Sequence, residues 1–404
     1  MMPISRIYVL VCVAIPLLSA EVSPAERKIA AAQAAITRNP GHPDGYAELG
    51  LALAMRARET SDTSYYDKGL EAAARALSID PENYSALRTK TWILLGRHQF
   101  TDALAAAQIL QKRSADDVMV YGFLSDAYTE LGRYPEAEKA TQWMLDLRPG
   151  NIPALTRTAH LRELFGDPEG AFELISMALR QLAPAETENR AWLLVQASHI
   201  RLAQGNLAQA EQLAEHALKT FAGYHYALGQ LAKIRRVQKR YSDAVALEQD
   251  RIKTAPHAEN RYQLAVSLAL AGEKAQAQRA FQEFERSARD EMNGTDNANH
   301  ELIFYYTDHA RKPKEALQVA RLEFARRQDV HTLHAYAWAL HSAGQPGEAR
   351  KQIERALAVG IKDAEIFRHA ATIAAARKDR VNAARYRRQA DELTPDSASL
   401  SAGR

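Results

Sequence analysis

The pattern of apolar and polar positions is clearest in residues 118–151, where two amphipathic helices follow one another. Gly132 marks a turn between them, and Pro149 ends the second helix. Small Ser125 and Ala137 stand where the two helices must cross closely. Two helices this short cannot bury both of their apolar faces alone, so the pattern predicts neighbours of the same kind. Apolar side chains recur at helical spacing at Tyr121, Leu124, Tyr128, Ala137, Ala140, Met144 and Leu145.

The same pattern recurs along the chain. The alanine equivalent to Ala137 is found at Ala103, Ala137, Ala171, Ala210, Ala244, Ala277, Ala316, Ala349 and Ala383. These positions are separated by 34, 34, 39, 34, 33, 39, 33 and 34 residues. The turn glycine recurs at Gly166, Gly205, Gly272 and Gly344, and the closing proline at Pro81, Pro256 and Pro395.

A helix–turn–helix period of about 34 residues resembles the tetratricopeptide repeat (TPR) family. The segments LGRYPEA (131–137) and AGQPGEA (343–349) are the most typical of it. The resemblance covers roughly residues 25–396 and implies an all-α, right-handed α-solenoid of about ten TPR-like helix-turn-helix repeats. Such a stack grows by adding repeats rather than by enlarging one core, so 404 residues need not form several globular domains.

Composition and charge narrow the possible partners. The chain has 52 basic and 49 acidic residues and a net charge of +3, and no basic run is interleaved with aromatic residues. This balance does not favour a nucleic-acid partner. With 47% hydrophobic and 25% charged residues, the composition is that of an ordinary folded protein.

The N-terminus has the features of a secretory signal peptide. Arg6 precedes an apolar run over residues 7–18, which Ser19 and Ala20 follow. The run is shorter than the ~20 residues of a spanning helix, and we expect cleavage after about Ala20. The only cysteine, Cys12, lies in this segment, so the mature chain has no disulfide. A periplasmic or secreted protein with no spanning membrane segment after signal removal is predicted.

The repeat divides the chain into five parts. They are a signal peptide (1–20), an N-terminal solenoid (21–289), a polar connection (290–300), C-terminal repeats (301–396) and a disordered tail (397–404). The connection, DEMNGTDNANH, is the most polar and turn-rich stretch of the interior, and is the candidate hinge. A second polar stretch, RETSDTSYYD (58–67), is expected to be an inserted loop.

Functional residues are expected on the concave surface of the solenoid. In the TPR family this surface is lined by the second, fifth, ninth, twelfth and thirteenth residues of each first helix. Aromatic and arginine side chains are the usual anchors of interfaces. The same positions also include Met119, Asp126, Glu130, His160 and Glu163. The resulting candidate partner-binding groove contains Trp192, His199, Tyr226, Lys233, Arg236, Tyr262, His331, His334, Trp338, His341 and Arg368.

Histidines are concentrated in one candidate helix. His331, His334, Trp338 and His341 fall within an arc of about 80° on a helix. His331 and His341 are about 15 Å apart along its axis, which is too far for a single metal site. His331 and His334 can share an ion only with help from a neighbouring helix. The sequence HELIF (300–304) begins like a zinc-protease helix but has Phe304 where a second histidine is needed.

The sequence therefore predicts an exported TPR scaffold that binds a protein or peptide partner in its concave groove. One alternative is a structural subunit of an envelope complex that uses the edges and ends of the stack. Another is a metal- or small-ligand-binding protein centred on His331 and His334. No catalytic set, cofactor site or complete metal site is predicted, and we expect a binding protein rather than an enzyme.

Overall fold

The computed structural model describes residues 22–294 and 297–393, and within these ranges every regular element is a helix. The expected signal peptide and C-terminal tail lie outside the described residues. Helix α1 (Pro24–Arg38) starts the stack, and ten helix pairs follow, as the repeat period predicted. The first helices of these pairs are α2 (Pro43–Thr60), α4 (Tyr84–Gly96), α6 (Val118–Glu130), α8 (Ile152–Leu164), α10 (Thr187–Ala203), α12 (His225–Val237), α14 (Ala258–Leu270), α16 (Asn299–Phe304) continued by the π-helix η1 (Tyr305–His309), α18 (Val330–Ser342) and α20 (Ala364–Ala376).

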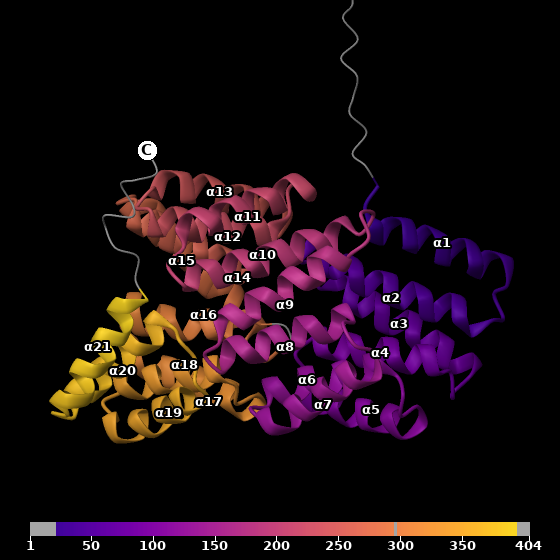
Figure 1. Ribbon diagram of the computed structural model, residues 1–404. Coiled ribbons are helices and arrows are strands. Elements are labelled where there is room, and N and C mark those ends of the chain that lie inside the picture. The colour runs from indigo at the N-terminus through magenta and orange to yellow at the C-terminus, as the bar shows by residue number, and fades with distance from the viewer. Residues whose placement is uncertain (1–21, 295–296, 394–404) are drawn as a thin grey trace, which may run out of the picture.

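Each first helix packs antiparallel against a second helix, and successive pairs stack side by side (Figure 1). The second helices are α3 (Ser64–Ile79), α5 (Phe100–Arg113), α7 (Tyr134–Leu147), α9 (Pro168–Gln181), α11 (Leu207–Thr220), α13 (Tyr241–Thr254), α15 (Lys274–Glu291), α17 (Pro313–Arg326), α19 (Pro346–Ala358) and α21 (Arg380–Glu392). The all-α TPR-type solenoid is thereby confirmed.

The repeated alanines explain how the helices approach one another. Ala137 and its equivalents are at most 4% exposed. Ser125 is also buried, and its hydroxyl lies 2.7 Å from that of Thr141 on the paired helix. Small side chains at the crossing allow close packing, and larger ones such as Met144, which is fully buried, fill the space beside it.

The prediction of an inserted loop at residues 58–67 is wrong. Helix α2 continues to Thr60, and α3 already begins at Ser64. The polar residues lie on helices that are longer than those of the next repeats, because Arg58 and Glu59 point to partners inside the molecule. Glu59 accepts hydrogen bonds from the Ser23 hydroxyl at 2.6 Å and from the Ala25 amide at 2.9 Å.

The polar connection at 290–300 is attached to its neighbours on both sides of the undescribed pair 295–296. Arg326 donates hydrogen bonds to the carbonyls of Asn293 and Gly294, at 3.0 and 2.9 Å. The Asn299 amide bonds the Met292 carbonyl at 3.2 Å and the Glu323 carboxylate at 3.1 Å. The division into two stacks with a hinge between them stays a prediction.

The stack closes on itself, which the sequence did not predict. Helices α17–α20 lie beside α6–α8 (Figure 1), and one apolar cluster joins Ala137, Leu161 and Leu164 to Val330, Ile361 and other residues of the C-terminal repeats. The Gln328 amide donates to the Glu130 carbonyl at 3.2 Å. The Val330 amide donates to the Tyr134 hydroxyl at 2.9 Å. Repeats nearly 200 residues apart are therefore in direct contact.

Candidate functional site

The inner side of the closed stack forms a cavity of about 830 Å³ that is partly open to solvent, which we call the lumen. Side chains of α8, α10, α12, α14, α16, α18 and α20 line it, together with the segment 361–363 before α20. Two smaller cavities, of about 290 and 240 Å³, adjoin it and share His160. The first helices line the lumen because the repeat puts every first helix on the inner side of the stack.

Most of the predicted groove residues meet in the lumen. Its lining includes His199, Tyr226, Lys233, Arg236, Tyr262, His331, His334 and Arg368. The other three, Trp192, Trp338 and His341, do not line it. Trp192 is half-buried and packs against the apolar clusters of the neighbouring repeats. No contact in the structure tests whether any of these residues binds a partner.

Trp338 and His341 form a stack between repeats instead. Trp338 lies flat on His369, with ring centres 3.7 Å apart. His341 also stacks against Trp338, with ring centres 5.1 Å apart. The indole nitrogen of Trp338 donates to Asp308 at 2.7 Å. Asp308 belongs to η1, and the wider π-helical turn brings it to this position. The two aromatic residues thus help to join α16, α18 and α20.

Several lumen side chains are held by their neighbours. His199 Nε2 lies 3.1 Å from the Glu163 carboxylate. Arg236 donates to Glu248, Ser267 and Gln263, each at 3.0 Å. A rigid guanidinium bound on three sides presents a fixed surface to a ligand. Lys233, by contrast, is exposed within the lumen and its side chain is free to turn towards a ligand.

Several acidic and histidine residues of the lumen were not among the predicted site residues. Glu259 and Glu365 are the second residues of α14 and α20, and His300 is the second residue of α16. The positional rule for concave residues therefore includes them. The prediction passed over them because it favoured aromatic and basic side chains. Glu301, the third residue of α16, does not fall on an expected position and had no signal in the sequence.

The pKa values of the lumen carboxylates shift in both directions. For Glu163 and Glu301 burial raises the pKa, but the hydrogen bonds and charges of His199 and His300 outweigh it, so the net shift is downward. Burial, helped by the nearby Glu301, raises the pKa of Glu259 to about 7. Burial and the neighbouring Asp363 also raise the pKa of Glu365. For His300, burial lowers the pKa but the hydrogen bond and charge of Glu301 outweigh it, so the net shift is upward.

The histidines of α18 and α20 release their protons more easily than usual. Burial lowers the pKa of His331 and lowers that of His334 well below its ordinary value. Burial also lowers the pKa of His369 to about 4. His334 Nε2 and His369 Nδ1 are 2.7 Å apart and share one hydrogen bond. The histidines of α18 and α20 therefore act as neutral hydrogen-bonding groups.

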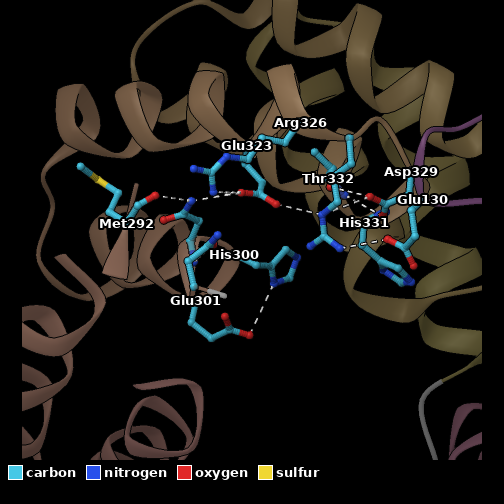
Figure 2. Close-up of polar contacts among 12 residues, drawn as sticks. Glu130, Met292, His300, Glu301, Glu323, Arg326, Asp329, His331 and Thr332 are labelled. Atoms are coloured by element: carbon cyan, nitrogen blue, oxygen red, sulfur yellow. Dashed lines mark hydrogen bonds and ion pairs between the residues drawn. The ribbon is translucent and has the colours of Figure 1, made fainter. Parts of the chain in front are cut away.

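An arginine outside the first helices joins the two sides of the closed stack. Arg327, which follows α17, lies 3.0 Å from Glu130, 2.9 Å from Glu323 and 3.6 Å from Asp329. Figure 2 shows these three carboxylates converging, with His300 and Glu301 beside them. Burial and the neighbouring Asp329 raise the pKa of Glu130 to about 7, against the opposing effect of Arg327.

The metal alternative finds no complete ligand set in the part of the chain that the structure describes. Within residues 22–294 and 297–393, no group of three or more His, Cys, Asp or Glu side chains is placed to hold a metal ion. His331 and His334 line the same lumen, but His334 is directed to His369.

The outer surface has one apolar feature of its own. Ile109, Trp143 and Met177 occupy the same position in three consecutive second helices, each 34 residues from the last. Their exposed fractions are 59%, 43% and 37%. Corresponding positions in later repeats include His216 and Asp250, so the apolar stripe is confined to α5, α7 and α9.

No helix in the described ranges is long and apolar enough to cross a membrane. No protein-family model and no curated protein matches the sequence.

Comparison with solved structures gives long but distant matches. The human IFIT1 dimer with PPP-AAAA is 14% identical, with a TM-score of 0.52, and the match covers 92% of this chain and 87% of that one. The human IFIT1 dimer with m7Gppp-AAAA is 15% identical, with a TM-score of 0.51 over 91% and 85% of the two chains. A match to the APC/C hetero-tetramer Cut9-Hcn1 is 13% identical, with a TM-score of 0.47. It covers 85% of this chain, which spans only 55% of the length of that chain.

At these identities a likeness establishes the fold alone. The helix-pair period, the buried alanines and the two IFIT1 structures agree on it: the chain has the fold of a tetratricopeptide-repeat α-solenoid.

Proposed function

We propose that the protein is a scaffold that binds an extended segment of another polypeptide in its lumen. The observation that carries this is the cavity of about 830 Å³, which seven consecutive first helices surround. Its volume lies within the range of about 300–1,000 Å³ found for ligand pockets. A complex with a folded partner buries roughly 800 Å² of accessible surface on each side. A folded domain does not fit inside a lumen of this size, whereas an extended chain can enter it and contact its walls.

The lining supports a peptide of mixed polarity. Tyr226, Tyr262 and Phe304 offer aromatic surface for apolar side chains. Gln196, Gln230 and Gln263 offer amide groups that can pair with a peptide backbone. Docking on such fixed groups loses little side-chain entropy. We propose binding rather than a chemical reaction.

The acidic residues make a nucleic acid the less favoured ligand. The IFIT1 structures contain PPP-AAAA and m7Gppp-AAAA. In this chain Lys233, Arg236 and Arg368 share the lumen lining with Glu163, Glu259, Glu301 and Glu365, so the lining does not offer the uncompensated basic surface that a polyphosphate needs. PPP-AAAA is therefore a suitable comparison probe for the binding experiment.

The experiment is selection of random linear peptides on the immobilised protein, followed by affinity measurement of the selected peptides. Wild type should bind them, and Lys233→Trp, which places a bulky, rigid side chain in the lumen, should weaken the binding at least tenfold. Lys253→Trp on the outer face of α13 is the matched control, because Lys253 is exposed and does not line the lumen. Equal loss in both variants, or binding of PPP-AAAA alone, would count against a peptide ligand.

A second candidate is the structural subunit that uses the outer surface. The apolar stripe of Ile109, Trp143 and Met177 supports it, because exposed apolar residues that recur on one face often mark an interface. A photo-crosslinking amino acid at position 143 or 233, in the native host, separates the two candidates. Adducts only from position 233 support the lumen, and adducts only from position 143 support the outer surface.

We also propose that the chain is exported after cleavage near Ala20. The support is the sequence pattern of residues 6–20. Mass spectrometry of the protein isolated from its host tests it: the N-terminal peptide should begin close to Glu21. A peptide that retains residues 7–18 would contradict cleavage.

A further inference from the structure

The lumen is a property of the closed stack. Its wall includes His160, Glu163 and Leu164 of α8 as well as Glu365 and Arg368 of α20. These two helices are joined not by stacking of neighbours along the chain but by the closing contact. If that contact opens, one side of the lumen wall is lost while every other pair of adjacent repeats stays in place.

Two glycines make the closing contact possible. Gly132 and Gly166 occupy the turns after α6 and α8, with φ of +71° and +80°. A Cβ atom on Gly132 would lie 2.5 Å from the carbonyl oxygen of Gln328. A Cβ atom on Gly166 would collide with the carbonyl oxygen of Gly360, and one on Gly360 would lie 2.9 Å from that of Phe165. Backbone meets backbone here, so no flexible side chain can move aside.

The same turn elsewhere accepts other residues. His98, Lys239 and Lys378 have φ of 57°, 60° and 62° at equivalent turns. Gly272 and Gly344 have positive φ but nothing within 4 Å of an added Cβ. Turn geometry alone therefore does not require glycine at every repeat. At Gly132 and Gly166 glycine is required for a second reason, which is the close approach of the C-terminal repeats.

Polar groups complete the contact. Arg327 joins Glu130 of the N-terminal repeats to Glu323 and Asp329 of the C-terminal repeats, as Figure 2 shows for the three carboxylates. Tyr134 contributes its hydroxyl to the Val330 amide, and its ring packs on Phe165 at 6.1 Å. The contact thus combines backbone, ionic and apolar parts, and Leu164 and Ile361 of its apolar cluster also line the lumen.

We propose that the closing contact regulates the lumen: closure at Gly132 and Gly166 controls access to it, and a ligand that touches both α8 and α20 favours the closed form in return. The second half of this statement rests on the proposed function, and the first half does not. The reciprocity follows from linkage, since a ligand that binds one form better shifts the equilibrium towards that form.

The test measures access without any ligand. In a Cys12→Ser background, Lys233→Cys places a single thiol in the lumen. Its labelling rate is measured with N-ethylmaleimide and with a polyethylene-glycol maleimide of several kilodaltons. The ratio of the two rates reports access for a polymer chain. The ratio is compared among the closed wild-type background, the pair Gly132→Ala/Gly166→Ala, and the control pair Gly272→Ala/Gly344→Ala.

The control pair is matched in backbone strain. Its φ values of +80° and +74° are close to those of the test pair, but its added methyl groups meet nothing. We expect the test pair to raise the polymer-labelling ratio by about fivefold or more, the usual lower range of such couplings, while the control pair leaves it near wild type. Equal ratios in the two pairs would overturn the proposal.

A second measurement guards against a variant that merely unfolds. Circular dichroism checks helical content, and energy transfer between dyes at exposed Glu138 on α7 and Lys351 on α19 reports closure directly. The test pair should lower the transfer with helical content unchanged. If transfer falls but labelling does not change, closure does not control access. If both change but no peptide binds to wild type, closure stands and the proposed ligand class is wrong.

Discussion

At the scale of single residues, buried charges are matched to partners from distant repeats. Arg58 at the end of α2 bonds Glu188 at the start of α10, and its backbone carbonyl lies 3.1 Å from His225 Nε2 on α12. Glu188 also accepts a hydrogen bond from Tyr224, which is fully buried, at 2.6 Å. This cluster joins repeats that are 130 or more residues apart. Its charged members are needed together, because the Glu188 side chain is only 6% exposed and Arg58 is its cation.

Removing Arg58 should therefore be costly. Arg58→Ala leaves Glu188, only 6% exposed, without its cation, and should lower the free energy of unfolding by about 3 kcal/mol. The matched control is Arg240→Ala, whose pair with Asp243 is about half exposed on both sides and should change it by less than about 0.5 kcal/mol. Urea unfolding measures both, and similar losses in the two variants would contradict the role of Arg58.

Glu130 and Glu259 give a prediction on pH. Their pKa of about 7 lies above the ordinary 4.5, so the folded state binds more protons than the unfolded state between these values. The stability that these protons contribute is fully present below the unfolded pKa and is lost as pH rises through the folded pKa. Buried His225 and His369, with pKa of about 4, act in the opposite direction in an overlapping range.

The double variant Glu130→Gln/Glu259→Gln isolates the carboxylate contribution. The difference in melting temperature, variant minus wild type, should increase as the pH rises from about 5 to about 7.5. Only wild type loses stability in this range, because only wild type has these two groups to ionise. The charged neighbours of both groups are unchanged in this variant. They are Arg327, Asp329 and Asp126 beside Glu130, and Glu301, Arg251, His300 and Glu248 beside Glu259. Melting curves across this range test it, and a constant difference would show that neither group titrates there.

Local side-chain roles could be predicted from the sequence more easily than distant ones. The burial of Ala137, Met144 and Leu124 follows from helical spacing. The partner of Arg58 could not be found, because no spacing rule connects residues 58 and 188. The same holds for Arg327 and Glu130. A polar segment is interpreted as a loop when the sequence gives no sign of its partners in another repeat. This is why residues 58–67 were wrongly expected to be a loop.

At the scale of elements, the repeat is regular except at α16. This helix has only 6 residues and continues as a π-helical turn of 5 residues. The wider turn lets Tyr305 and Tyr306 both reach Glu285 on α15, at 3.2 and 3.1 Å, and brings Asp308 to Trp338. The weak match of the sequence YYTDHARKPKEA to the repeat thus has a structural counterpart in an altered helix.

Asp308 should be important for how α18 is placed. Asp308→Ala removes the acceptor of the Trp338 indole and should lower the free energy of unfolding by about 1 kcal/mol, the usual size for one hydrogen bond. Asp308→Asn keeps an acceptor oxygen and should retain most of it. Urea unfolding and the emission of Trp338 measure the effect. Equal effects of alanine and asparagine would mean that the charge, rather than the hydrogen bond, is what Trp338 needs.

The elements themselves were largely predictable, since periodicity and turn glycines locate helix pairs without knowledge of the fold. Turns without glycine were harder. Arg311 and Lys378 adopt the same positive φ as the turn glycines, 53° and 62°, although such residues rarely do so. The π-helical turn had no signal, because it differs from an α-helix by one residue in hydrogen-bond register. Of the candidate groove, the positional rule found the helices and most of the side chains that face the lumen.

At the scale of the whole molecule, closure connects the third and fourth helix pairs to the C-terminal repeats and should change how the protein unfolds. An open solenoid can unfold from either end, since each repeat contacts only its neighbours. Here the apolar cluster and the Arg327 contacts join both ends of residues 132–360. Wild type should therefore unfold in one transition, with circular dichroism and the fluorescence of the 4 tryptophans coincident.

Gly132→Ala/Gly166→Ala should separate these two probes and broaden the transition, whereas Gly272→Ala/Gly344→Ala should only shift it. The physical reason is that opening leaves two free ends from which unfolding can start. Thermal unfolding followed by both probes is the measurement. A single sharp transition in the first pair would show that the closing contact adds nothing to cooperativity.

Closure also places a limit on evolutionary change. In an open array, duplication or loss of one repeat leaves a working molecule with a longer or shorter groove. Between Phe165 and Gly360 the same event would move Gly360 away from Phe165 by one repeat, and the two ends would no longer meet. Homologues of this chain should therefore keep a constant number of repeats in this interval, and variation in length should be confined to the repeats outside it.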